Sequence, residues 1–147
     1  MNSDSQIKAL LIALSSNPTP ALTCINRLTP EMLCFVLPET QKKALESNLQ
    51  PQIAKMPQKW DWIITEDPWS FLKSHQALTQ NLPNILRTWG VQPGELVVDL
   101  TSATPGMAAA MVLASRPFTS RIVLLSEPQI GLLTDSTVPR EQCQAWE

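Results

Sequence analysis

Two short runs of small polar residues carry the side chains of this sequence that are best suited to bind a ligand. The first is Ser15-Ser16-Asn17-Pro18-Thr19, and the second is Thr101-Ser102-Ala103-Thr104-Pro105-Gly106, followed by Met107. Each run follows an apolar segment and precedes a segment with helical spacing, so each is expected at the N-terminus of a helix. Free N–H groups and the helix dipole bind anions there without any cation. The two runs therefore suit a ligand with several phosphates or ribose hydroxyls.

Helix capping offers a simpler explanation for either run taken alone. Ser, Thr and Asn are preferred before a helix, and every strand-to-helix loop needs such a residue. Two runs at neighbouring strand ends favour one shared ligand site over two separate caps. Asp99, just before the second run, has two open roles: a structural acceptor that orders the loop, which we favour, or a direct ligand contact. Gly106 is expected to let a ligand approach the backbone closely.

Residues after the third expected strand are candidates for the rim of the same site. Glu66 and Asp67 are placed there, but neighbouring side chains point in different directions, so they are not expected to act as an acid–base pair. Trp69 either packs against the domain, which we favour, or stacks on a base. His75 is expected to be a solvated surface residue.

Several common functional sites are absent from the sequence. There is no Gly-x-Gly-x-x-Gly motif, which argues against a nicotinamide or flavin dinucleotide, and there is no P-loop. No spacing of Cys, His or carboxylates predicts a metal site, and no cofactor is expected. The net charge of -2 and the scattered basic residues argue against binding to duplex nucleic acid.

The sequence also bears on the location of the protein. No apolar run approaches the roughly 18 residues that span a bilayer, and the first residues lack the positive charge of a secretory signal. Cys24, Cys34 and Cys143 are expected to be reduced thiols. These features predict a cytoplasmic protein without membrane contact.

Alternating apolar and amphipathic segments predict an α/β domain over residues 7–126. Expected strands cover residues 7–14, 32–37, 60–65, 95–101 and 121–126, and expected helices cover residues 19–28, 39–53, 69–89 and 105–115. The third helix is expected to be kinked or divided at Pro83, and Gly90 to cap its end. The helix over 105–115 is small and apolar on most faces, so burial is expected. Residues 127–147 are expected to form an edge element, a linker or a truncated connection to an effector domain.

Near-continuous apolar strands separated by helices predict a Rossmann-like fold, with a parallel sheet and helices on both faces. Open sheets of this kind bind ligands beyond the carboxyl ends of their strands, where strand order reverses. The first strand is usually central in such sheets and the fourth lies beside it. The two polar runs follow these two strands, so they are expected to meet.

The beginning of the chain is similar to the opening of the CARF domains (CRISPR-associated Rossmann fold), which are the sensor domains of type III CRISPR ancillary proteins. The similar part consists of the segment from Leu10 to Pro20, the helix after it and the segment 28–36. Both have an apolar strand, a small polar loop, a helix and a Pro before the second strand. The segment 98–107 resembles the family pattern Asp-x-Thr-Gly-Gly-Thr-Lys-x-Met. The positions that keep this pattern are Asp99, Thr101, Thr104 and Met107. The departures are Ser102 and Ala103 in place of the glycines, and Pro105 in place of the lysine.

The resemblance implies a specific ligand and partner. CARF domains bind cyclic oligoadenylates, such as the tetra- and hexa-adenylate, across the two-fold axis of a homodimer, and both loops of both copies contact the ring. A symmetric ring on a symmetric dimer repeats each half-site. The resemblance therefore implies a sensor that controls an effector domain, and that effector is not present in this chain.

Two alternatives remain open at this stage. Some CARF proteins are ring nucleases, in which a ribose 2′-hydroxyl attacks the neighbouring phosphate without a metal and the protein positions the groups. Ser15 or Ser16 would then supply the catalytic serine, but neither loop holds a Lys or Arg, so cleavage is expected to be slow or absent. The other alternative is an unrelated Rossmann-like module that binds a nucleotide or mediates dimerisation.

Overall fold

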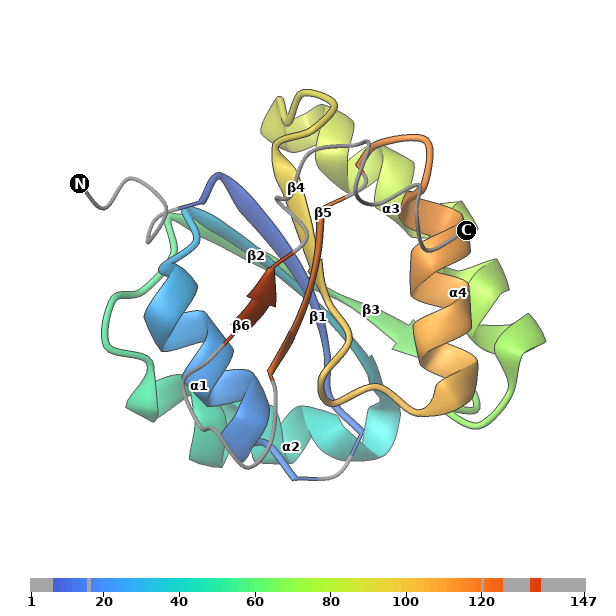
Figure 1. The fold of residues 1–147 in the computed structure, drawn as a ribbon. Coiled ribbons are helices and arrows are strands. Elements are labelled where there is room, and N and C mark those ends of the chain that lie inside the picture. The colour runs from blue at the N-terminus through green and yellow to red at the C-terminus, as the bar shows by residue number, and fades with distance from the viewer. Residues whose placement is uncertain (1–6, 16, 120, 126–132, 136–147) are drawn as a thin grey trace.

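The protein folds around one six-stranded sheet with the strand order β3-β2-β1-β4-β5-β6 (Figure 1). The structure is a computed structural model that describes residues 7–15, 17–119, 121–125 and 133–135. Its strands are β1 (Ala9–Ala13), β2 (Met32–Pro38), β3 (Lys59–Thr65), β4 (Leu96–Asp99), β5 (Arg121–Leu125) and β6 (Leu133–Asp135). The first five strands are parallel, and β6 pairs antiparallel to β5. The predicted α/β, Rossmann-like fold with a parallel sheet is confirmed.

Strand β1 lies at the centre of the sheet because it is apolar on both sides. All five of its residues are buried, and it pairs with β2 on one side and β4 on the other. Strands buried on both faces are typical of parallel sheets covered by helices on each side. In the β1–β4 pairing Ile12 lies opposite Asp99, so the chain leaves both strands at the same edge.

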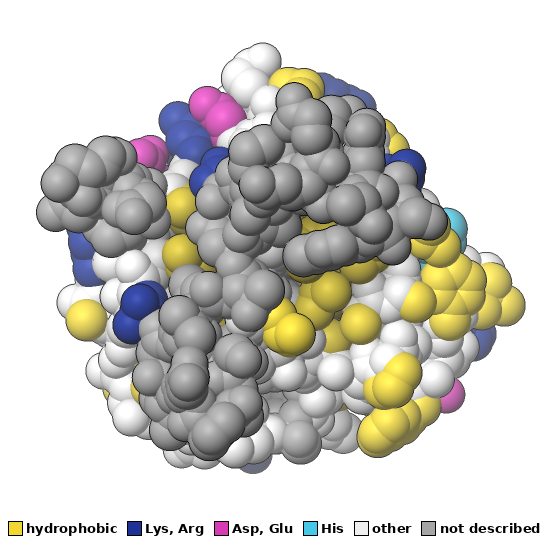
Figure 2. Space-filling view, in the orientation of Figure 1, with side chains coloured by type: hydrophobic (Ala, Val, Ile, Leu, Met, Phe, Trp, Pro, Cys, Tyr) yellow, Lys and Arg dark blue, Asp and Glu magenta, His cyan; other side chains and the backbone are white. Residues whose placement is uncertain are grey.

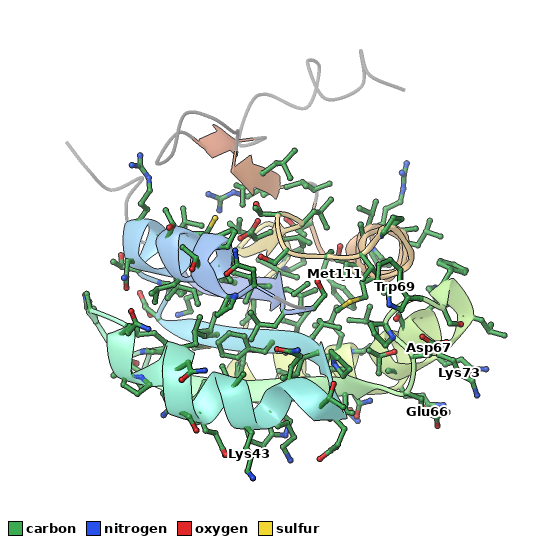
Figure 3. All side chains as sticks on the ribbon, turned by 90° about the horizontal axis from the view of Figure 1, so that it is seen from below. Lys43, Glu66, Asp67, Trp69, Lys73 and Met111 are labelled. Atoms are coloured by element: carbon green, nitrogen blue, oxygen red, sulfur yellow. The ribbon has the colours of Figure 1, made fainter. Side chains whose placement is uncertain are left out.

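Helices cover both faces of the sheet (Figures 1 and 3). Helix α1 (Thr19–Leu28) and the segment 39–53 pack on one face, against side chains such as Leu10 and Ile12. Helices α3 (Phe71–Trp89) and α4 (Pro105–Ser115) pack on the other face, against Leu11. Successive side chains of a strand point to opposite faces, so β1 serves both layers of the core.

The segment 39–53 is less regular than the single helix predicted for it. It forms a series of short turns, η2 (Glu39–Gln41), α2 (Lys42–Ala44), the π-helical η3 (Leu45–Leu49) and η4 (Gln50–Gln52). Its buried residues Leu45, Leu49 and Ile53 are spaced four apart, which is a spacing that one face of an α-helix also has. All three belong to the core on this face of the sheet, so the segment has a buried apolar side although its backbone is irregular.

Helix α4 departs from the prediction that it is buried on most faces. Met107, Ala110, Met111 and Ala114 face the core, but Ala109 lies at the surface and Leu113 is 52% exposed. The expectation was wrong for this outer side, because apolar composition alone does not tell whether another element covers a helix. One apolar face of α4 is therefore left uncovered by the described residues.

Residues 127–147 are only partly described. Within them, β6 lies at the edge of the sheet beside β5. The remaining residues, including Cys143, fall outside the described part of the chain, so the prediction for this segment stays a prediction. Cys24 and Cys34 are free thiols and are buried.

Helix α3 contains a proline but is continuous from Phe71 to Trp89. It begins after Ser70, whose hydroxyl accepts the Lys73 amide at 3.1 Å, and it ends at Gly90, which has the positive φ of 70° that glycine tolerates. Of the two expected alternatives, a kink or a division at Pro83, the division does not occur. Pro83 nevertheless leaves the carbonyl four residues earlier without its helical N–H partner.

Replacing Pro83 with alanine is therefore expected to stabilise the protein by about 1–3 kcal/mol, because it restores the missing hydrogen bond and removes the ring clash. The free energy of unfolding from urea titration measures the effect. Pro20→Ala is the matched control, because Pro20 lies in the first turn of α1, where no helical partner is lost. A less stable Pro83→Ala variant would contradict this account of the helix.

Candidate functional site

The two predicted loops lie side by side at the carboxyl edge of the sheet. Strands β1 and β4 are neighbours and run parallel, so the residues that follow them leave the sheet together. The hydroxyl of Ser15 donates a 2.7 Å hydrogen bond to the backbone carbonyl of Ser102. This bond joins residues that are 87 positions apart and ties the first loop directly to the second.

The first loop is shaped by its own side chains as it enters α1. The Thr19 amide donates to Asn17 Oδ1 at 3.1 Å, and the Leu22 amide donates to the Pro18 carbonyl at 2.9 Å. Asn17 and Thr19 are exposed, while Ser15 and Pro18 are half-buried. Ser16 lies outside the described residues. The loop therefore presents polar side chains at the surface next to the start of α1.

The second loop is closed by a helix cap. Thr104 Oγ1 accepts the Met107 amide at 3.1 Å, and the Ala103 amide donates to the Leu100 carbonyl at 3.1 Å. Thr104 and Met107 are buried. The positions left accessible are Pro105, which is exposed, and the half-buried residues Thr101, Ser102, Ala103 and Gly106. The motif positions thus divide into residues that shape the loop and residues that form its surface.

Asp99 is fully buried and organises the start of the second loop. Its Oδ1 accepts the Thr101 amide at 2.9 Å and the Thr101 hydroxyl at 2.6 Å. Its Oδ2 is buried without a hydrogen-bond partner among the described residues, as is Ser102 Oγ. This geometry fits the structural role that we favoured for Asp99 over direct contact with a ligand.

Burial dominates the electrostatics of Asp99. Loss of solvent raises the pKa of this carboxyl, and the Thr101 hydroxyl, the Thr101 amide and the Cys24 thiol act in the opposite direction. The pKa of Cys24 is also raised, by its own burial first and by the nearby Asp99 charge second. The Cys24 thiol therefore stays protonated at neutral pH and is a poor nucleophile.

A third loop, residues 66–70 between β3 and α3, is attached to the same site. The Thr104 hydroxyl donates to the Pro68 carbonyl, so the residue that caps α4 also holds this loop. A Cβ added to Gly106 would lie 2.9 Å from the Trp69 carbonyl oxygen. The sequence analysis placed this loop at the rim but did not find these contacts, because hydrogen bonds to backbone carbonyls leave no pattern in the sequence.

Glycine is needed at position 106 because a side chain there would collide with the backbone of this third loop. We expected Gly106 to admit a ligand, whereas here it admits the backbone of the third loop.

Among the rim residues, Glu66 is paired with Lys73 at 3.1 Å, and Asp67 Oδ1 accepts the Trp69 amide at 2.9 Å (Figure 3). His75 is half-buried and stacks on Phe71, with ring centroids 5.2 Å apart.

Two negative findings apply to the described residues. They contain no group of three or more His, Cys, Asp or Glu side chains placed to hold a metal ion. Nor do they include a helix that is both long and apolar enough to cross a bilayer.

Fold and loops together define the class of this protein as a Rossmann-like α/β domain whose candidate ligand site lies at the carboxyl edge of its sheet.

No family model matches the sequence, and no curated protein matches it. Among solved structures, Can2 from Sulfobacillus thermosulfidooxidans in complex with cyclic tetra-adenylate matches 81% of this chain with a TM-score of 0.61 and 13% identity. Enterococcus italicus Csm6 bound to cyclic hexa-2′-fluoro-hexa-dAMP matches 83% with a TM-score of 0.64 and 17% identity.

A type III CRISPR defence DNA nuclease activated by cyclic oligoadenylate matches 80% of the chain with a TM-score of 0.57 and 19% identity. At these identities the likeness establishes the fold, and it is consistent with the CARF resemblance of the two loops. The match covers 32% of the Can2 chain, 34% of the Csm6 chain and 18% of the nuclease. The present chain therefore corresponds to one part of each of these larger proteins.

The raised pKa of Asp99 predicts a specific pH dependence of stability. As pH rises above the ordinary aspartate value of about 4, the unfolded chain ionises before the folded one, so the free energy of unfolding falls until the native carboxyl also ionises. Asp99→Asn removes this decline, so its stability relative to the unmodified protein is expected to rise with pH through that window. Urea unfolding between pH 4 and pH 8 measures the difference.

Asp99→Ala separates the charge from the hydrogen bonds. It should flatten the pH profile as Asp99→Asn does, but should be less stable than Asp99→Asn by about 1–3 kcal/mol, because Thr101 loses its acceptor. If the free energy of unfolding changes with pH in the same way for the unmodified protein and both variants, ionisation of Asp99 does not cause the decline in stability.

Proposed function

We propose that this chain is a CARF domain that binds a cyclic oligoadenylate at the carboxyl edge of its sheet and serves as a sensor in type III CRISPR antiviral defence. The observation that carries the proposal is the bond from Ser15 to the Ser102 carbonyl, which makes one continuous surface of the two loops that resemble the family. The ligands in the structures of Can2 and Csm6, which share this fold, support the class of ligand. Ribose hydroxyls and phosphates suit the hydroxyl and amide groups of these loops.

The chemistry of the loops determines how the ring is held. Residues 15–19 and 101–107 contain no Lys or Arg, so binding depends on neutral hydrogen bonds and on the helix starts of α1 and α4. Asp99, Thr104 and Met107 shape the second loop from below, because they are buried. Asn17 and Thr19 are exposed, so their side chains are in positions to contact the ligand.

The outer face of α4 supports a homodimer. Ala109 and Leu113 are exposed there, and half-buried Val112 lies between them in sequence. Figure 2 shows hydrophobic side chains at the surface on the flank of the molecule where α4 lies. This face begins at the second ligand loop, so a second copy docked on it brings two such loops together. A ring with repeated units fits a dimer of this symmetry.

Control of an effector is part of the proposal. The chain corresponds to about a third of Can2 and Csm6, so the part that responds to the ligand would be a further domain or a partner protein.

Calorimetric titration with cyclic tetra- and hexa-adenylate tests the binding function. We expect one ring to bind per two chains, and sedimentation to show a dimer. Leu113→Glu is expected to convert the dimer to a monomer and to weaken ring binding at least about tenfold, because it buries a charge in the apolar contact. Thr88→Glu, at an exposed position near the far end of α3, is the control and should change neither result.

Two outcomes would overturn this proposal. If neither ring binds to the folded protein, the CARF function is wrong. If a mononucleotide binds more tightly than either ring, the chain is a Rossmann-like nucleotide-binding module instead.

The ring is expected to be recovered intact. A ring nuclease of this family uses a lysine in the second loop, whereas Pro105 occupies that position here, and the Ser15 hydroxyl is already bound to the Ser102 carbonyl. Chromatography of the nucleotide after incubation with excess protein measures cleavage. Pro105→Lys places a lysine at the family position and should cleave faster than the unmodified protein. Ring opening within minutes by the unmodified protein would show that it is a nuclease, and Ser15→Ala would then test its serine.

A further inference from the structure

Trp69 is the most exposed of the large hydrophobic side chains in the described part of the protein. The residue as a whole is 74% exposed, compared with 59% for Leu72 and 52% for Leu113. A tryptophan buries a large apolar area when it packs, so leaving the indole in water forgoes a substantial stabilisation. Packing, the role we favoured for Trp69 from the sequence, does not account for this exposure.

The backbone that carries this indole is held firmly. The Trp69 amide donates to Asp67 Oδ1 at 2.9 Å, and the Ser70 amide donates to the Asp67 carbonyl at 3.1 Å. Behind them, Thr65 Oγ1 and Ser74 Oγ lie 3.0 Å apart and are both buried. A fixed backbone lowers the entropic cost of ordering the indole against a ligand, because only the side-chain torsions remain to be restricted.

The same backbone is fastened to the second ligand loop. Thr104 donates its hydroxyl proton to the Pro68 carbonyl, and Gly106 leaves just enough room for the Trp69 carbonyl, which would be 2.9 Å from an added Cβ. Figure 3 shows Trp69 beside the start of α4 on the carboxyl side of the sheet. The indole therefore stands next to the surface formed by residues 101–106.

We propose that Trp69 stacks on an adenine base of the bound ring and so adds a base-recognition element from a third loop, an inference that rests on the proposed function. Bases stack on aromatic side chains with substantial free energy, and each base has a face available for this contact. The two family-like loops contain no Lys or Arg to pair with the phosphates, so a stacking contact would add affinity that these loops do not supply through charge. Backbone and hydroxyl groups hold the ribose and phosphate, and the indole holds the base.

This assignment differs from a role in the dimer contact. The proposed dimer surface follows the outer face of α4 through Ala109 and Leu113, whereas Trp69 lies on the loop that precedes α3. Loss of the indole should therefore weaken ring binding and leave the dimer unchanged. A dimerisation role predicts instead that loss of the indole breaks the dimer and, with it, weakens ring binding.

Trp69→Ala and Trp69→Phe test the inference by calorimetric titration with the ring that binds the unmodified protein. Stacking of about 1–3 kcal/mol per base predicts at least a fivefold weaker affinity for Trp69→Ala. Trp69→Phe is expected to recover part of the affinity, because phenylalanine keeps a smaller aromatic face. Trp60→Ala is the matched control, since Trp60 is a partly exposed indole near the opposite end of β3 and should leave the affinity unchanged.

Fluorescence provides a second readout. Stacking on a base should quench tryptophan emission when the ring is added, and Trp69→Phe should abolish that quenching. Unchanged affinity and unchanged quenching in folded Trp69 variants would overturn the inference while leaving the proposed function intact. Dissociation of the dimer in Trp69→Ala would overturn it as well, by assigning the indole to the contact between copies. Absence of ring binding by the unmodified protein would instead remove the proposed function on which the inference rests.

Discussion

The parallel pairing of β1 with β4 at the centre of the sheet is the constraint on which the candidate site depends. Both strands are buried at every position, so their place in the sheet is fixed by burial of apolar side chains on two faces. Ile12 and Asp99 lie opposite each other near the ends of these strands. Two polar loops more than 80 residues apart in sequence then emerge together, and the bond from Ser15 to Ser102 becomes possible.

A small set of polar side chains fixes the backbone of the loops that follow these paired strands. Asp99 holds Thr101, and Thr104 holds both the start of α4 and the carbonyl of Pro68. These contacts stabilise backbone geometry and leave other groups free to meet a ligand. The cost is visible at Asp99, where one carboxylate oxygen is buried without a partner in the described residues and burial raises the pKa. Stability and site geometry are thus coupled at one residue.

Periodicity was a good guide where an element is defined by one continuous apolar pattern. The positions of β1, β2, α1 and α4 followed from their residues to within one or two positions at most ends. It was a poorer guide to the segment 39–53, whose apolar spacing suits one α-helix although the segment forms short turns, one of them π-helical, and to Pro83, through which α3 continues. In both cases packing against the sheet overrides the local preference.

The sequence by itself determined the fold class and the two polar loops, because burial patterns and helix caps are local properties of neighbouring residues. Only the tertiary structure decided what these residues do. It placed Ser15 against Ser102, buried Asp99, and brought the third loop with Trp69 onto α4. It also left the outer face of α4 uncovered, contrary to its composition. These outcomes depend on which distant segments meet, and contacts to backbone atoms or to open solvent leave no trace in the order of side chains.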